Sequence, residues 1–287
     1  MNESTLKNLV PAFLKELENK GRSKATLLAY RSDLEQLVIF LKGKGKVSVS
    51  QVVQEDIENF RDSLLSDKYT PKSVSRKLNA IKTFFRFLVS KKIALSDSSK
   101  NVSHPKIEIS SPKFLSPLEY RALRDAVRND KRALAIVELI LQAGLRISEV
   151  ANLRVKDIKN GVLTIRAQST QPERVINLNE SAANAIAEYL VERAVGATEI
   201  LFVSKNGNPL AVRNIRATVD RHMQKAGING YSVNDLRTTF IVENLRAGTD
   251  LVFLSKIVGH KRLSTTERYL ELAEVKNSGK LQQLAEL

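Results

Sequence analysis

Two arginines, a histidine and a tyrosine are the residues of this sequence whose types and spacing could cut a phosphodiester bond. His260 and Tyr269 lie nine positions apart in the basic segment VGHKRLSTTERYLE. Arg146 and Arg237 lie in segments that we expect to be apolar helices, where a guanidinium is costly unless it faces an anion. Two guanidiniums can hold a phosphate bidentately while a tyrosine phenol attacks the phosphorus. The set therefore predicts a covalent phosphotyrosyl intermediate.

Each of these residues also has an ordinary structural interpretation. Arg146 could form a surface ion pair with Glu149, and Tyr269 could be an amphipathic residue of the core. Structural roles of this kind are the more common ones for single residues. The chemical interpretation is favoured because it explains all members of the set together, while the structural one stays open for each residue.

The charge of the chain favours a polyanionic partner, and nucleic acid above all. The 46 Lys and Arg residues exceed the 31 Asp and Glu residues, which gives a formal charge of +15. No long apolar run and no signal-peptide core occur, so we expect a cytoplasmic protein that does not enter a membrane. The chain has no cysteine and three widely spaced histidines, so we expect no metal.

The first hundred residues predict an all-helical domain. Apolar side chains recur at three- and four-residue steps in four segments: 8–21, 22–46, 48–66 and 70–92. Ser23 is a suitable N-cap for the second of these. The fourth carries an array of basic residues suited to DNA phosphates, namely Lys72, Arg76, Lys77 and Arg86. A solvated basic face is the alternative for this array.

The rest of the chain predicts a linker and a second, mainly helical domain. Residues 101–113 are rich in Ser, Pro and Lys and show no periodicity, as expected of a linker between domains 1–100 and 114–287. In the second domain, 161–179 reads as two short strands around a polar turn, which predicts a small antiparallel sheet. The remaining periodic segments predict helices, the last of them over residues 265–277.

Five segments of the chain resemble motifs of the tyrosine recombinases of the integrase family, and they occur in the family's order. GLRISEVANLRVKDI resembles the segment around the first catalytic arginine, LRTTF the second arginine segment, and VGHKRLSTTERY the histidine-to-tyrosine segment. GRSKATLLAYRSDLEQLVIFL and TPKSVSRKLNAIKTFFRFLVSK resemble two helices of the family's N-terminal domain. The chain is close in size and layout to Xer-type and transposon-borne members.

The resemblance implies a SAM-like helical core-binding domain followed by a catalytic domain, which together clamp double-stranded DNA. By this resemblance, Arg146 and Arg237 would clamp the two non-bridging oxygens of the scissile phosphate. His260 would donate a hydrogen bond to that phosphate, and Tyr269 would be the nucleophile. The implied activity is site-specific recombination (integration, excision or resolution) through a 3′-phosphotyrosyl bond, without ATP, a metal or another cofactor.

The chain departs from the family at two positions. The family usually has a histidine where this chain has Asn234, whose amide can bind a phosphate but cannot pass on a proton near neutral pH. The family also has a lysine in the hairpin, whereas here Ser169 lies near that position and no lysine occurs from Gly161 to Leu178. Arg166 is a possible substitute and Arg174 is the other near cation, although an arginine is a poor proton donor.

These departures leave two further functions open beside an active recombinase. One is a catalytically weak or inactive relative that binds DNA as an accessory protein, and the other is a type IB topoisomerase, which also uses a tyrosine and an arginine clamp. We favour the active enzyme because the two arginines, the histidine and the tyrosine are all present.

The resemblance also implies assembly into a tetramer on two DNA duplexes, with a C-terminal helix of each protomer docked on its neighbour. Leu281, Leu284 and Leu287 lie three positions apart and could form the apolar stripe of such a helix. A frayed tail that packs on its own domain is the alternative. We expect double-stranded DNA and further copies of the chain as partners.

Overall fold

The computed structural model describes residues 5–108, 111–167, 171–194 and 198–273. They belong to two compact units, Met1–Ser110 and Ser111–Leu287, and each is described by itself. The division falls within the predicted linker. Helices dominate both units, which confirms the predicted fold class. None of the described helices is long and apolar enough to cross a membrane.

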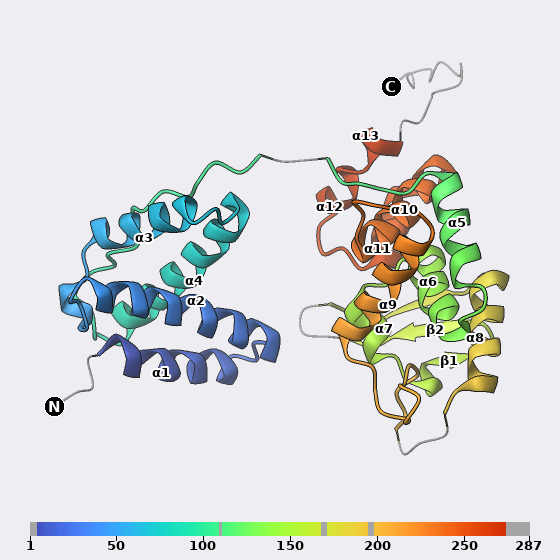
Figure 1. The fold of residues 1–287 in the computed structure, drawn as a ribbon, viewed down its shortest axis with the longest axis horizontal. Coiled ribbons are helices and arrows are strands. Elements are labelled where there is room, and N and C mark those ends of the chain that lie inside the picture. The colour runs from blue at the N-terminus through green and yellow to red at the C-terminus, as the bar shows by residue number, and fades with distance from the viewer. Residues whose placement is uncertain (1–4, 109–110, 168–170, 195–197, 274–287) are drawn as a thin grey trace, which may run out of the picture. The chain divides into compact units, whose positions relative to one another are not determined.

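The N-terminal unit is a bundle of four helices, α1 (Leu6–Asn19), α2 (Lys24–Gly43), α3 (Gln54–Ser66) and α4 (Pro71–Ser90), with a short 3-10 turn at Val49–Gln51 (Figure 1). Ser23 caps α2 by accepting a hydrogen bond from the backbone N–H of Thr26 at 3.2 Å. The apolar stripes of the helices meet in one core, where the rings of Phe13 and Phe84 pack edge to face at 5.4 Å.

The C-terminal unit combines helices with a small sheet (Figure 1). Its elements are α5 (Pro117–Val127), α6 (Lys131–Ala143), α7 (Ile147–Asn152), β1 (Ile158–Lys159), β2 (Val162–Ile165), β3 (Arg174–Asn177), α8 (Glu180–Glu192), α9 (Val212–Lys225), α10 (Val233–Arg246), α11 (Leu251–Val258), α12 (Ser264–Glu267) and α13 (Leu270–Ala273), with a 3-10 turn at Val155–Asp157. The strands are antiparallel in the order β1-β2-β3, and Leu163 pairs with Ile176. The predicted hairpin is confirmed, while β1 was not predicted.

The turn that follows α6 differs from the prediction. α6 ends at Ala143 because Gly144 adopts the left-handed conformation, with φ of 60°. A Cβ atom at this glycine would lie 2.4 Å from a ring carbon of Phe240, so the position also needs a glycine for space. Arg146 is consequently the N-cap residue of α7 and not, as we expected, a residue within a continuous apolar helix.

The segment that carries Tyr269 also differs from the prediction. We expected one helix over residues 265–277, but α12 ends at Glu267 and α13 begins at Leu270. Tyr269 lies in the break between these two single-turn helices. Residues 274–287 lie outside the described residues, and they include the end of that expected helix and the predicted C-terminal exchange helix.

Candidate active site

The C-terminal end of α11 gathers both predicted arginines. Arg237, on α10, donates to the carbonyl oxygens of Gly144 and Val258, the latter at 2.5 Å. Arg146 donates to the same Val258 oxygen at 3.2 Å and to that of Gly259 at 2.9 Å. The last carbonyls of a helix have no intrahelical donor and carry the negative end of its dipole, so they suit guanidinium groups. The structure therefore brings Arg146 and Arg237 together at one helix end.

A third arginine and a carboxylate complete this group. Arg174, on β3, donates to the carbonyl oxygen of Ile257 at 2.6 Å and to both carboxylate oxygens of Glu149 at 2.9 and 2.8 Å. Glu149 also accepts from the backbone N–H of Arg146 at 2.8 Å and from its guanidinium at 3.1 Å. One buried carboxylate thus ties α7 to β3. We call Arg146, Arg174 and Arg237 the arginine cluster.

Arg174 and Glu149 were not predicted as members of this group. Arg174 was considered only as a cation near the missing lysine, and Glu149 only as an ion-pair partner of Arg146. A usable signal was the strand alternation, because Arg174 shares the buried face of β3 with Ile176. A charged residue at an inward strand position needs a buried partner. The expected ion pair between Glu149 and Arg146 exists, but it occurs beside the contacts of Arg146 with α11.

Burial and neighbouring charges set the protonation states in the cluster. Burial by itself raises the pKa of Glu149, but hydrogen bonds from Arg174 and the backbone of Arg146 outweigh it, so the net pKa is lowered. Burial, followed by the charge of Arg146, lowers the pKa of Arg237 to about 9, which leaves it charged at neutral pH. The side chain of Arg146 is 31% exposed against 7% for Arg174, so Arg146 offers its guanidinium to a ligand from solvent.

His260 and Tyr269 lie together at the same helix end. His260 directly follows Gly259, the left-handed cap of α11, and its ring stacks on that of Tyr269 with centroids 6.3 Å apart. Burial, and then the charges of Arg237 and Arg146, lower the pKa of His260 to about 4, so the ring is neutral at pH 7. The Tyr269 ring also packs against the cluster of apolar residues on α10 and α11, as the structural interpretation expected.

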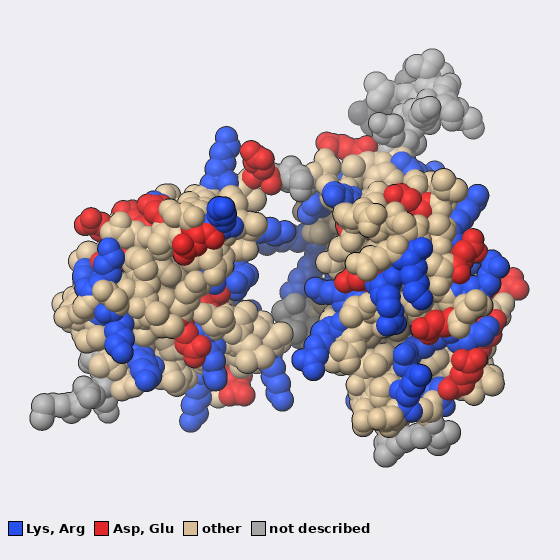
Figure 2. All heavy atoms as spheres, in the orientation of Figure 1, with Lys and Arg blue, Asp and Glu red and all other residues tan. Residues whose placement is uncertain are grey.

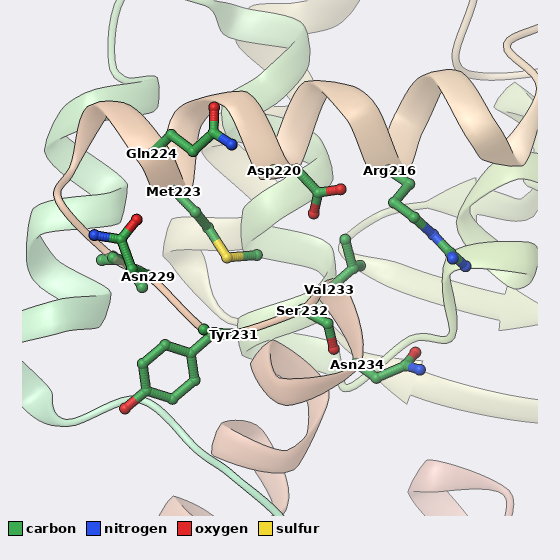
Figure 3. A pocket seen from close by; sticks show the side chains of 11 residues that line it. Arg216, Asp220, Met223, Gln224, Asn229, Tyr231, Ser232, Val233 and Asn234 are labelled. Carbon is green, nitrogen blue, oxygen red and sulfur yellow. The ribbon is translucent and has the colours of Figure 1, made fainter. Parts of the chain in front are cut away.

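Asn234 and Arg166, the residues considered for the missing groups, have different surroundings. Asn234 is exposed in the first turn of α10 and lines a pocket of about 280 Å³, where it lies at the same end as Arg216 (Figure 3). Arg166 donates to Asp157 at 3.1 Å and to the carbonyl oxygen of Asn152 at 2.6 Å. These contacts engage its guanidinium outside the arginine cluster. Ser169 lies outside the described residues.

In the described ranges, no group of three or more His, Asp or Glu residues could hold a metal ion. The acidic and imidazole groups of the candidate site are instead engaged by hydrogen-bond donors or by hydroxyl groups, as Glu149 and His260 show. A site of this composition can hold an anion through its guanidinium groups.

The basic residues predicted on α4 do not share one environment. Lys72, Arg76 and Arg86 are exposed, and Figure 2 shows basic side chains over the visible face of each unit. Lys77 is 6% exposed, and its ammonium lies 3.0 Å from the Asp33 carboxylate. A lysine paired with a buried carboxylate is poorly placed to reach a phosphate, so this placement argues against the predicted contact of Lys77 with DNA. Arg76 also pairs with Asp33.

Two family models match the chain. The phage integrase family matches residues 113–275, and the N-terminal SAM-like domain of phage integrases matches residues 10–92. The two matches fall in different units of the structure.

Curated relatives match over almost the full length. Tyrosine recombinase XerC of Roseiflexus castenholzii is 31% identical over 279 residues, covering 92% of this chain and 88% of the relative. Tyrosine recombinase XerC of Caldanaerobacter subterraneus subsp. tengcongensis is 31% identical over 311 residues, covering 95% and 88%.

Solved structures share the fold at lower identity. The XerA recombinase matches with a TM-score of 0.54 and 24% identity, covering 92% of this chain and 93% of that one. A lambda integrase dimer bound to a core site matches with a TM-score of 0.76 and 16% identity, covering 91% and 97%. A lambda integrase tetramer bound to a Holliday junction matches with a TM-score of 0.75 and 17% identity, covering 90% and 78%. At these identities the likeness supports the fold.

Proposed function

Because the chain belongs to the phage integrase family and is a tyrosine recombinase, we propose that it recombines double-stranded DNA at specific sites through a covalent bond to Tyr269. The observation that carries this proposal is the meeting of Arg146 and Arg237 at the end of α11, where His260 stacks on Tyr269. The motif resemblance and the geometry point to the same four side chains.

In the proposed reaction, the phenol of Tyr269 gives its proton to solvent water and attacks the scissile phosphorus. A bond from the Tyr269 oxygen to phosphorus forms, the bond to the 5′ oxygen breaks, and the 5′ oxygen takes up a proton. The product is a 3′-phosphotyrosyl bond and a free 5′ hydroxyl. Attack by the 5′ hydroxyl of another strand reverses the step, so the phosphodiester is restored without an external energy source.

The arginine cluster would stabilise the negative charge that grows on the phosphate oxygens. Arg146 and Arg237 both donate to main-chain carbonyl oxygens at the α11 end, and these contacts fix their orientation before DNA arrives. Donors that need no reorganisation stabilise a transition state most effectively. His260 is neutral, so it would act as a hydrogen-bond donor to the phosphate and not as an acid.

The 5′ leaving oxygen still needs a proton donor. Asn234 would bind phosphate only, because its amide does not ionise. Arg166 is engaged by Asp157, and a guanidinium is too weak an acid to replace the family's lysine. We therefore propose that solvent water donates the proton to the 5′ oxygen, and that Arg166 only contacts the DNA backbone.

We extend the DNA-binding role to the N-terminal unit and to assembly. Lys72, Arg76 and Arg86 are exposed on α4 and would contact phosphates, which gives affinity without sequence preference.

The lambda integrase tetramer bound to a Holliday junction supports a tetramer as the active form of this chain. Exchange of a C-terminal helix remains a prediction, since residues 274–287 lie outside the described residues. We also place the protein in the cytoplasm.

Covalent trapping tests the proposal. Wild type, Tyr269→Phe and Tyr231→Phe are incubated with nicked suicide substrates made from the flanks of the protein's own gene, and covalent protein–DNA complexes are resolved on denaturing gels. Tyr231 is the matched control, because it is a partly buried tyrosine of the same unit whose hydroxyl contacts Glu119. We expect a band from wild type and from Tyr231→Phe but not from Tyr269→Phe. Specific DNA binding without any band would instead favour the accessory-protein function.

A further inference from the structure

Thr266 lies between His260 and Tyr269 in the sequence and contacts both. It is fully buried in α12, and its hydroxyl oxygen lies 2.8 Å from Nδ1 of His260. Its carbonyl oxygen accepts from the backbone N–H of Tyr269 at 3.0 Å. Neither the motif resemblance nor the reaction above assigns a role to this threonine.

The hydroxyl of Thr266 has one hydrogen-bond partner in the part of the chain that the structure describes, and that partner is His260. Threonines in longer helices often donate back to the carbonyl four residues earlier, as Thr238 and Thr239 do in α10 at 3.3 and 2.8 Å. Thr266, in the single-turn helix α12, shows no such bond to a carbonyl among the described residues. The imidazole of His260 is therefore the group in place to accept the hydroxyl proton of this buried residue.

The imidazole itself can accept that proton at Nδ1 only in one tautomer. Burial and four arginines, Arg237, Arg146, Arg174 and Arg268, keep the ring neutral, so it carries one N–H group, at either Nδ1 or Nε2. If Nδ1 carried the proton, it would face the hydroxyl oxygen and leave the buried hydroxyl proton without an acceptor. A buried donor without a partner is more costly than an unused lone pair.

We propose that Thr266 sets the tautomer of His260: the hydroxyl donates to Nδ1, which leaves the ring proton on Nε2. The consequence of this tautomer rests on the proposed function: Nε2–H is the group of His260 that can donate a hydrogen bond to an oxygen of the scissile phosphate. The opposite tautomer would present a lone pair to the phosphate and repel it. Thr266 is thus a positioning residue, which acts on the phosphate through His260.

Nuclear magnetic resonance on the DNA-free protein tests the tautomer directly. The chain has three histidines, so selective ¹⁵N labelling of histidine gives a spectrum of three rings, and His260→Gln assigns the signal of interest. Thr266→Val removes the hydroxyl at nearly constant shape, and Thr266→Ser keeps it. At pH 7 we expect the Nε2–H tautomer in wild type and Thr266→Ser, and a shift toward Nδ1–H in Thr266→Val. An Nδ1–H ring in wild type, or an unchanged tautomer in Thr266→Val, would overturn the assignment.

Single-turnover cleavage of the suicide substrates tests the consequence. We expect Thr266→Val to lower the rate of covalent-complex formation at least tenfold, with DNA affinity and Tm close to those of Thr266→Ser, which should cleave like wild type. Equal rates in the two variants despite different tautomers would refute the catalytic part alone. If wild type forms no covalent complex, the proposed function fails, and the tautomer measurement still decides the role of Thr266.

Discussion

Replacing Glu149 by glutamine should destabilise the C-terminal unit, because the carboxylate holds two arginines at once. Glu149 is 5% exposed and accepts both terminal nitrogens of Arg174, whose side chain is 7% exposed. Glutamine keeps the shape and one acceptor oxygen, but it turns an amide NH2 group toward a guanidinium. Arg174 would keep its contact with Ile257 and would lose the charge that compensates its burial.

The size of the effect follows from the burial of this pair. Breaking a buried ion pair on one side costs about 3–5 kcal/mol, and the remaining contact with the α11 carbonyl favours the lower end, about 3 kcal/mol. For a unit of this size that corresponds to a fall in Tm of about 6–12 °C. The folded-state pKa of Glu149 is lowered, so this stabilisation is present above the unfolded pKa, about 4.3, and is lost as the pH falls through the folded value.

Thermal unfolding of the full chain, followed by circular dichroism at pH 7 and again below pH 4, measures this effect. The matched control is Glu243→Gln, which removes the charge of a half-buried partner of Arg246 at 2.9 Å and should change stability by about 0–1 kcal/mol. We expect the difference between wild type and Glu149→Gln to be largest at pH 7 and to shrink in acid. A Tm for Glu149→Gln within a degree of that for Glu243→Gln would refute the reasoning.

Three further predictions concern other parts of the molecule. Lys77→Met should lower the Tm of the N-terminal unit and leave the salt dependence of DNA binding unchanged. Lys72→Gln should leave the Tm unchanged and reduce the slope of log K against log salt by about 0.9. Thermal unfolding measures the first effect, and anisotropy titrations at several salt concentrations measure the second. Gly144→Ala should destabilise more than Gly248→Ala in denaturant unfolding, because both positions have positive φ but only the former Cβ would meet a side chain. Burial and the neighbouring arginines lower the pKa of His260 to about 4, so the unfolded chain takes up this proton at a higher pH than the folded one. The free energy of unfolding should therefore decrease as the pH is lowered from about 6.5 to about 4, by at most about 1.4 kcal/mol per pH unit. His260→Gln should remove that dependence.

Local sequence signals predicted most of the fold. The stripe of apolar residues behind Ser23 predicted a helix over 22–46, and α2 occupies Lys24–Gly43 because that serine caps it. The hairpin was predicted from apolar runs around a polar turn. β1 was missed because a strand of two residues is too short to show an alternation. The break at Tyr269 was missed because the apolar spacing continues through it.

For the candidate site, the motifs predicted which residues take part but not the contacts that hold them. Arg146, Arg237 and His260 were found through motifs, but the partners that orient them are fixed by tertiary contacts. Arg174 meets Glu149 across 25 positions of sequence, and no spacing rule connects them. The ion pair of Lys77 was not predicted for the same reason, since its partner Asp33 lies 44 positions away. A helix position alone does not distinguish a basic residue that faces solvent from one that faces an internal acid.

The arginine cluster carries more positive charge than an intact phosphodiester can neutralise. Its three guanidinium groups and the Glu149 carboxylate sum to a formal charge of +2, the ring of His260 is neutral, and Arg268 adds a further positive charge beside that ring. An intact phosphodiester carries one negative charge, whereas the five-coordinate phosphorus of the proposed attack by the Tyr269 oxygen would carry two. The positive charge of the site is therefore better matched by the reacting phosphorus than by an intact strand. Such an imbalance favours the reacting state over the bound substrate, so tight binding of DNA must come from contacts elsewhere on the protein.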